Sequence, residues 1–356
     1  MRTSLSGGAL ALLMLAAPTH AQDEDQIIVE SPLLHPAAGL MGEHMHDGGE
    51  VMVGLRFERS RWGGANRAGD ETIADPAIVA AGFSARTAAM TMDMVMLDVM
   101  YAPTDKVTLM VMPHYMWHRM EMRGIDPAAG AGGGGHSAHG AGHVIPFGEV
   151  HAHSTEGFGD TLVSASYRLA RGRRLGAHAT LGVWVPTGAS GQKNADGTYV
   201  HYGMQPGSGT WDLEPSVTLT GRSGAAGWGA QAAYRWRTRE HNKSGFAFGD
   251  KARATGWASY LLDAGLGATA RLEYVHEGKV LGHYNGPHNH TAPSDRQENY
   301  GGDVVSAGLG LNWLLPVARG NRPQLGGELA VPLYQNLNGI QAPLKWRFSM
   351  ALSQAF

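Results

Sequence analysis

TLMVMPHYMWHRMEM, residues 108–122, alternates two kinds of side chain along its length. The even-numbered positions from Met110 to Met122 hold only methionine and histidine. The odd-numbered positions from Leu109 to Glu121 hold mostly large apolar and aromatic side chains. A period of two is that of a β-strand, whose successive side chains point to opposite faces. The stretch therefore predicts a strand whose two faces meet different surroundings.

The same alternation recurs along the chain, and helical spacing is nearly absent. About twelve segments show it, each near the roughly 9–11 residues that a tilted membrane strand needs. Segment 250–260 alternates least clearly. The predicted strands are 51–61, 91–101, 106–122, 158–169, 174–186, 210–221, 228–237, 250–260, 265–277, 303–316, 323–332 and 344–356.

The connections between these strands alternate between short and long. The short ones are 102–105, 170–174, 222–227, 261–265 and 317–322, and the long ones are 62–90, 123–157, 187–209, 238–249, 278–302 and 333–343. Short turns on one rim, long loops on the other and an even strand number are typical of outer-membrane barrels. The prediction is an all-β fold, a single transmembrane antiparallel β-barrel of about 12 strands over residues 51–356. Residues 22–50 would form a short periplasmic N-terminal segment.

Both ends of the chain agree with export to the outer membrane of a Gram-negative cell. Arg2, the apolar run 8–18 and Ala21 predict a signal peptide over residues 1–21. The last segment alternates and ends at Phe356, which resembles the signal that the barrel-assembly machinery reads. We therefore expect outer-membrane lipid and that machinery as partners.

The composition narrows the possible functions. The chain has no cysteine, which excludes disulfides and thiolate metal sites, and its net charge of −3 gives no basic surface for nucleic acid. The glycine run 130–135 lacks the lysine and helix of a phosphate-binding loop, and no serine nucleophile motif occurs. We predict no enzyme, no catalytic residue and no certain cofactor.

A barrel gives the alternating strands an inside and an outside. Histidine facing lipid is costly, so the methionine and histidine face should point into the lumen. The preceding segment 90–101 repeats the pattern, and a short turn joins the two as a hairpin. The candidate metal ligands on this hairpin are Met92, Met94, Met96, Met110, Met112, His114, Met116, His118, Met120 and Met122.

Thioether and imidazole are soft ligands that favour Cu(I) or another soft ion such as Ag(I). The competing interpretation is that methionine serves as a flexible apolar lining. Two further groups are candidate ligands: one just before the first strand, and one in the glycine-rich connection, which is extracellular by strand count and could equally be a solvated linker. They are His44, Met45 and His46, and His136, His139, His143, His151 and His153.

Several motifs resemble one family. They are MGEHMHDGGEVMVGLRF (41–57), the methionine-rich hairpin, GFGDT (157–161), VPTG (185–188) and PGSGTWDLEPS (206–216). They are similar to the outer-membrane transporter-like family labelled "putative MetA-pathway of phenol degradation". The resemblance implies a barrel and the passage of aromatic compounds. Members rich in methionine and histidine resemble a branch found with copper-handling genes, and the histidine-rich loop has no counterpart in the family pattern.

The sequence thus predicts an outer-membrane, channel-like barrel that binds or passes soft metal ions, most plausibly copper, through a Met/His-lined lumen. The alternative is a channel for small hydrophobic or aromatic compounds that uses the same methionines as apolar lining. A structural barrel without transport is the third interpretation.

Overall fold

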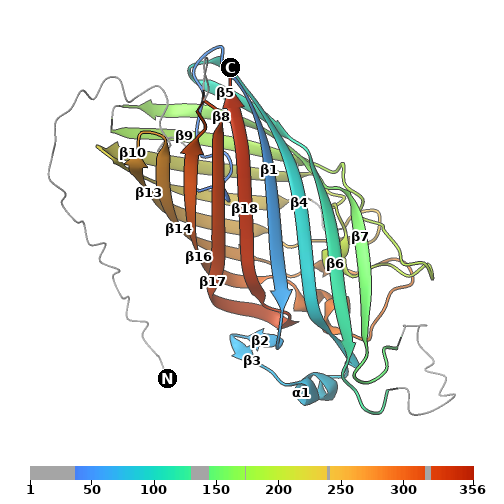
Figure 1. The fold of residues 1–356 in the computed structure, drawn as a ribbon. Coiled ribbons are helices and arrows are strands. Elements are labelled where there is room, and N and C mark those ends of the chain that lie inside the picture. Colours follow the sequence, from blue (N-terminus) through green and yellow to red (C-terminus); the bar gives the residue numbers. More distant parts are fainter. Residues whose placement is uncertain (1–36, 130–143, 173, 239–240, 317–321) are drawn as a thin grey trace, which may run out of the picture.

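The computed structural model describes residues 37–129, 144–172, 174–238, 241–316 and 322–356 (Figure 1). Long antiparallel strands make up almost all of this structure. The strands of the wall are β1 (Val51–Gly63), β4 (Ala85–Thr104), β5 (Val107–Met112), β6 (His114–Gly124), β7 (Val150–Phe158), β8 (Thr161–Arg171), β9 (Leu175–Val185), β10 (Asp212–Ser223), β11 (Ala226–Arg237), β13 (Lys251–Asp263), β14 (Leu266–Glu277), β16 (Gly302–Leu314), β17 (Gln324–Gln341) and β18 (Leu344–Ala355).

The remaining elements are short and belong to the long connections. They are β2 (Arg67–Gly69), β3 (Glu71–Thr72), β12 (Phe246–Ala247), β15 (Leu281–Gly282), helix α1 (Asp75–Ala80) and the 3-10 turns η1 (Tyr202–Met204), η2 (Pro293–Asp295) and η3 (Gln297–Asn299). No helix in the described part of the chain has the length and apolarity that a bilayer span requires.

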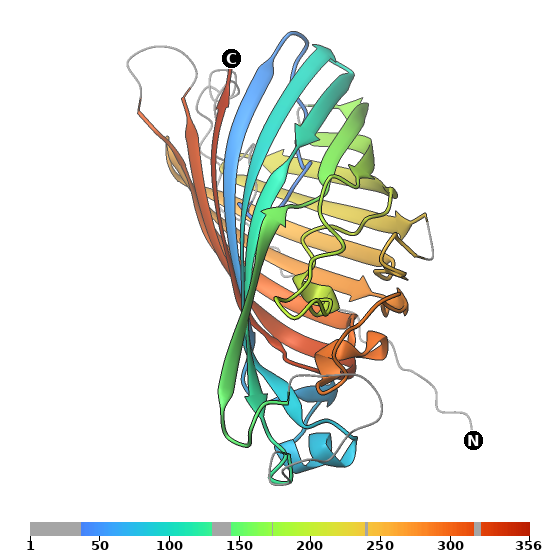
Figure 2. The same cartoon turned by 90° about the vertical axis from the view of Figure 1, so that its right-hand side faces the viewer.

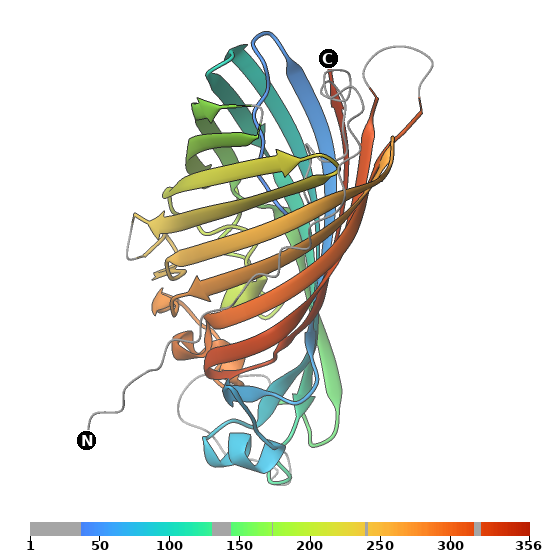
Figure 3. The same cartoon turned by 90° about the vertical axis from the view of Figure 1, so that its left-hand side faces the viewer.

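The wall closes into a barrel. Each strand pairs with the next, and β1 pairs with both β18 and β4. At the seam, the backbone N–H of Phe356 donates to the carbonyl of Val51 at 2.8 Å. β5 and β6 are halves of one strand interrupted at Pro113, and β7 and β8 are halves of another interrupted at Gly159 and Asp160. The predicted antiparallel barrel of twelve strands is therefore confirmed. Figure 3 shows that strands β10 to β17 run at a slant within the barrel wall.

The barrel is taller on one side than the sequence predicts. β4 has 20 residues, and β6 and β7 continue past the ends of the neighbouring strands (Figures 1 and 2). The predicted connection 123–157 is wrong in part, because it contains the strand β7. Within the described residues β7 pairs with β6 alone, and polar side chains on both of its faces hide the alternation from a hydropathy pattern. The predicted connection 62–90 likewise contains the start of β4.

The two faces of the methionine-rich strands point as predicted. Leu109, Val111 and Trp117 are exposed on the outer face, whereas His114 and His118 are buried inside. Large apolar and aromatic side chains cover the outside of the other strands as well. This outward apolar band suits contact with lipid, and closure pairs the edges around the ring except the far edge of β7, which has no strand partner among the described residues.

Residues 37–50 lie inside the end of the barrel that carries the short turns, and we name them the plug. Side chains from several sides of the wall hold the plug backbone. Arg56 on β1 donates to the carbonyl of Leu40 at 2.6 Å, and Gln231 on β11 donates to that of Met41 at 3.1 Å. His178 on β9 contacts the carbonyl of Gly42 at 3.0 Å. Because these anchors come from separate strands, the plug crosses the lumen.

Candidate functional site: the methionine-lined lumen

The lumen beyond the plug encloses a cavity of about 580 Å³. Strands β4, β5 and β6 contribute one wall of it, which we name the methionine wall. Its methionines are Met90, Met92, Met94, Met96, Met112, Met116 and Met120. His114 and Trp184 also line the cavity, with their rings edge to face at 6.2 Å. The wall is therefore largely apolar and polarizable.

The register of β4 against β6 brings the predicted ladder together. Met92 lies opposite His118, Met94 opposite Met116, and Met96 opposite His114. Directly opposed side chains on one face have Cβ atoms about 4.5–5.5 Å apart. Met100 and Met110, opposed on β4 and β5, pack with Met52 nearer the plug. Met122 lies at the other end, where the Thr87 hydroxyl approaches its sulfur at 3.6 Å. All ten hairpin residues therefore face the interior.

The wall across the lumen is charged. β13 is six strands from β4 in either direction around the ring, so it stands opposite the methionine wall. Charged side chains of β11, β13 and β14 line the cavity there. Lys251 pairs with Glu277 at 3.2 Å, and Arg253 pairs with Glu214 at 3.2 Å. Because these cations have carboxylate partners, the charged wall holds closely balanced pairs.

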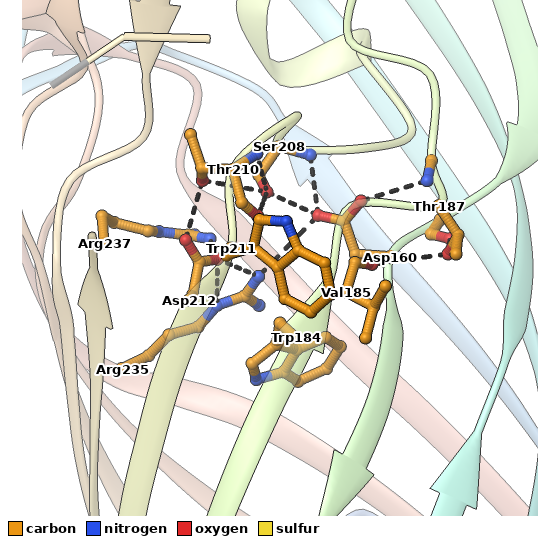
Figure 4. A network of polar contacts seen from close by, with 12 residues as sticks. Asp160, Trp184, Val185, Thr187, Ser208, Thr210, Trp211, Asp212, Arg235 and Arg237 are labelled. Atoms are coloured by element: carbon orange, nitrogen blue, oxygen red, sulfur yellow. Dashed lines mark hydrogen bonds and ion pairs between the residues drawn. The ribbon is translucent and has the colours of Figure 1, made fainter. Parts of the chain in front are cut away.

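A polar network ties the cavity wall to the connection 186–211 (Figure 4). Asp160, in the break between β7 and β8, accepts hydrogen bonds from the backbone N–H of Gly188 at 3.1 Å and of Ser208 at 2.8 Å. The Ser208 hydroxyl adds a third bond to Asp160, at 2.5 Å. One carboxylate thus fixes both ends of the connection, which we name the inward loop because it folds against the barrel interior.

The network continues from the inward loop to the charged wall. Asp212 at the start of β10 accepts hydrogen bonds from Thr210 at 2.7 Å, from Arg235 at 2.9 Å and from Arg237. The guanidinium of Arg235 lies 4.0 Å from the centre of the Trp184 ring, a cation–π contact. The motifs GFGDT, VPTG and PGSGTWDLEPS all contribute to this network, which explains why they occur together in one sequence.

Aromatic side chains gather where the long loops meet. Tyr284 stacks between Tyr199 and Tyr202, with ring centres 4.3 Å apart on both sides. Phe246 and Tyr300 pack edge to face against Tyr202, and Tyr300 reaches the cavity. Sequence reasoning missed this cluster, because its members lie in irregular connections without periodicity.

The other predicted ligands lie apart from the hairpin. His44 and His46 sit in the plug with ring centres 4.9 Å apart, and Met45 lies between them in the chain. Burial lowers the pKa of His46 to about 3. Burial alone would raise the pKa of Glu43, but His44 and Arg56 hold it at about 2.

The histidines of the glycine-rich connection divide into two sets. His151 and His153 belong to strand β7 and not to a loop, and His153 lies 5.9 Å from the His201 ring. His136, His139 and His143 lie outside the described residues. Among the residues that the structure describes, no group of three or more His, Asp or Glu side chains is placed to hold a metal ion.

Comparison with solved structures supports the barrel. The chain is similar to an outer membrane channel from Pseudomonas putida F1, with a TM-score of 0.55 and 15% identity over 89% of this chain and 99% of that one. Weaker likenesses include the transport unit of the autotransporter AIDA-I from Escherichia coli (TM-score 0.44, 9% identity, 90% and 94% of the two chains). Another is the NanC porin (TM-score 0.40, 8% identity, 84% and 98%).

A search of curated proteins finds no match. Family membership rests instead on the sequence itself. Residues 98–339 match the family described as "Putative MetA-pathway of phenol degradation". The match includes the end of β4, all of β5 and β6, the inward loop and the charged wall. The chain is a member of that family of outer-membrane-type β-barrels.

Proposed function

We propose that this barrel is a non-enzymatic outer-membrane channel that passes small hydrophobic or aromatic compounds. The observation that carries the proposal is the methionine wall along the 580 Å³ cavity. Pockets for small molecules typically measure about 300–1,000 Å³ and have mainly apolar linings with a few polar groups. Methionine side chains adapt to irregular apolar shapes and make favourable sulfur–aromatic contacts.

The remaining features of the lumen are consistent with this use. Trp184 and Tyr300 offer aromatic surfaces to a solute in the cavity. The charged groups opposite are paired with one another, so they offer hydrogen bonds without a strong field of one sign. The likeness to the Pseudomonas putida channel supports a channel over a purely structural barrel. We further propose that residues 1–21 direct export, that residues 22–50 enter from the periplasmic side with residues 37–50 as the plug, and that the last strand guides assembly.

The test changes the polarity of side chains in the methionine wall while keeping their size nearly constant. Cells with intact lipopolysaccharide would express the wild type, a Met92→Leu/Met94→Leu/Met116→Leu variant or the corresponding glutamine variant, at matched levels of folded barrel. Uptake of the fluorescent probe N-phenyl-1-naphthylamine is measured. We expect the leucine variant to match the wild type and the glutamine variant to slow uptake several-fold. Uptake no faster than in cells without the barrel would refute the proposal.

Binding or passage of Cu(I) or another soft ion is a second candidate function. It is favoured by the opposition of Met92 to His118 and of Met96 to His114 across β4 and β6. The buried Nδ1 atom of His114 also has no hydrogen-bond partner among the described residues. Thioethers suit Cu(I) and are poor ligands for Zn(II).

The leucine variant separates the two functions. Under the metal proposal it loses binding of Cu(I) or Ag(I) by the purified barrel while remaining folded, because leucine keeps the bulk and removes the sulfur. Zn(II) serves as the comparison ion. Equal Cu(I) binding by the wild type and the leucine variant would exclude the ladder as the site. The histidines of the plug and of residues 136–153 would be tested by the same titration after replacement with glutamine.

A further inference from the structure

We propose a second binding site, which takes one small hard cation between the plug and the barrel wall. The site is a cavity of about 20 Å³, separate from the large one. Glu43 and His44 of the plug face it from one side, and Asp98 of β4 and Gln324 of β17 face it from the wall. A cavity of at least about 10–15 Å³ admits a single water-sized particle. The space therefore suits one ion and excludes an organic solute.

Arg56 also lines this cavity, and three of the other lining residues carry an oxygen acceptor without a donor among the described residues. Glu43 Oε2, Asp98 Oδ1 and Gln324 Oε1 are buried and have no hydrogen-bond partner among the described residues. The three side chains are 4%, 1% and 6% exposed. Leaving a buried polar group unsatisfied costs about 1–3 kcal/mol, and more for a charged one. Three such atoms around one cavity point to a bound species that satisfies all of them together.

The unpartnered atoms decide the sign of that species. Two carboxylates, Glu43 and Asp98, lie beside the guanidinium of Arg56, and His44 is a second partner of Glu43. Arg56 directs its Nε to Asp98 Oδ2 and its Nη1 to the Leu40 carbonyl, so Asp98 Oδ1 and Glu43 Oε2 remain for another partner. His44 approaches the far oxygen of Glu43, Oε1, at 3.0 Å. Because the three unpartnered atoms are oxygens that only accept, they favour a cation over an anion as the bound species.

The ligand type identifies the class of cation. Carboxylate and amide oxygens are the ligands of hard ions such as Ca²⁺ and Mg²⁺, whereas soft ions favour sulfur and imidazole. An ion at this place would bridge the plug, β4 and β17, in addition to the bonds that Arg56 makes to Asp98 on β4 and to the plug. Occupancy would therefore hold the plug in the lumen, and removal of the ion would loosen it.

The experiment uses the full-length mature barrel in detergent, treated with a chelator and then dialysed at pH 8, where an unperturbed imidazole is neutral. Ca²⁺, Mg²⁺ and Na⁺ are titrated separately by calorimetry at constant ionic strength. We expect saturable binding of at least one of them with one site per barrel. Glu43→Gln should weaken it at least tenfold, whereas Gln324→Glu should strengthen it. Glu149→Gln, on an exposed carboxylate at the other end, is the matched control.

A second readout follows the plug itself. The chain has no cysteine, so Met45→Cys introduces a unique thiol in the plug. Its maleimide labelling should be several-fold slower with the bound ion than after chelation, and Glu43→Gln should abolish the difference. No saturable binding of any of the three ions, or equal binding by Glu43→Gln, would overturn the proposal and indicate that the cavity holds only water. Neither result depends on the solute that the large cavity takes.

Discussion

Asp212 is the carboxylate on which the polar network of the lumen depends. It is fully buried, and it accepts hydrogen bonds from Arg235, Arg237 and Thr210. Two guanidinium groups thus share one negative charge in a confined space. Removal of one partner from a buried ion pair leaves the other charge uncompensated, which costs more than the pair contributes.

Asp212→Asn should therefore destabilise the barrel by about 3–5 kcal/mol, because the amide keeps the shape and removes the charge that both arginines need. Unfolding in urea, followed by tryptophan fluorescence and by the heat-dependent shift of the folded band on gels, measures the loss. Asp70→Asn changes an exposed carboxylate and is the control. Equal unfolding midpoints for the two variants would show that Arg235 and Arg237 do not need Asp212.

The inward loop is the element that shapes the cavity on the side of β9 and β10. Its two ends touch at Gly188 and Gly207. A Cβ added to Gly207 would lie 2.4 Å from the carbonyl carbon of Gly188, and one added to Gly188 would lie 2.6 Å from the Gly207 Cα. Such backbone contacts cannot relax by moving a side chain. Glycine at both positions therefore allows the loop to close.

Gly207→Ala should displace the inward loop from its position in the barrel, while the strands still form. We expect a larger and noisier single-channel conductance in planar bilayers, because the loop no longer narrows the lumen. Gly327→Ala is the control, since an added Cβ there meets nothing within 4 Å. Conductance traces of Gly207→Ala that match those of Gly327→Ala would argue against a role for the loop in narrowing the channel.

The alternation of apolar and polar residues predicted the strands whose two faces differ. It failed for strands that have polar residues on both faces. The strands β5 and β6 and the inward direction of His114 and His118 followed from a period of two, because lipid and lumen differ. β7 was missed because its two faces do not differ in polarity in this way. The network of Asp160 and Asp212 was also missed, since it joins residues that only the folded loop and the neighbouring strand β11 bring together. Periodicity likewise carries no information on which strands stand opposite each other across the ring.

At the scale of the whole molecule, the plug separates the cavity from the short-turn end of the barrel. Its backbone is held from β1, β9 and β11, and His46 is buried within it. The amide N–H of His46 donates to the Thr108 hydroxyl at 3.2 Å, and its carbonyl accepts from Arg168 at 2.8 Å. We therefore infer that a solute in the proposed channel would meet the plug on its way to the short-turn end.

Acid should loosen the plug through His46. Burial lowers the pKa of its imidazole from 6.5 to about 3, so the seated plug favours the neutral ring. The resulting stabilisation is fully present above about pH 6.5 and decreases as the pH falls towards 3. We expect the open probability in planar bilayers to rise over that range in the wild type. In His46→Gln, whose side chain does not titrate, the part of this rise in open probability that comes from His46 should disappear.

His241→Gln, on an exposed ring, serves as the control and should keep the wild-type profile. Identical pH profiles for His46→Gln and the wild type would assign the acid response to other groups.

The methionine wall also has a redox chemistry of its own. Oxidation turns each apolar thioether into a polar, chiral sulfoxide, which the cell reverses only with dedicated reductases. The seven methionines of this wall, with Met41 of the plug, line one cavity that solutes from outside the cell would reach. Exposure to hydrogen peroxide should therefore convert the lumen from an apolar to a polar surface without changing the sequence, in proportion to the sulfoxides counted by mass spectrometry. The permeability of such a barrel would therefore depend on the oxidants to which its cell has been exposed.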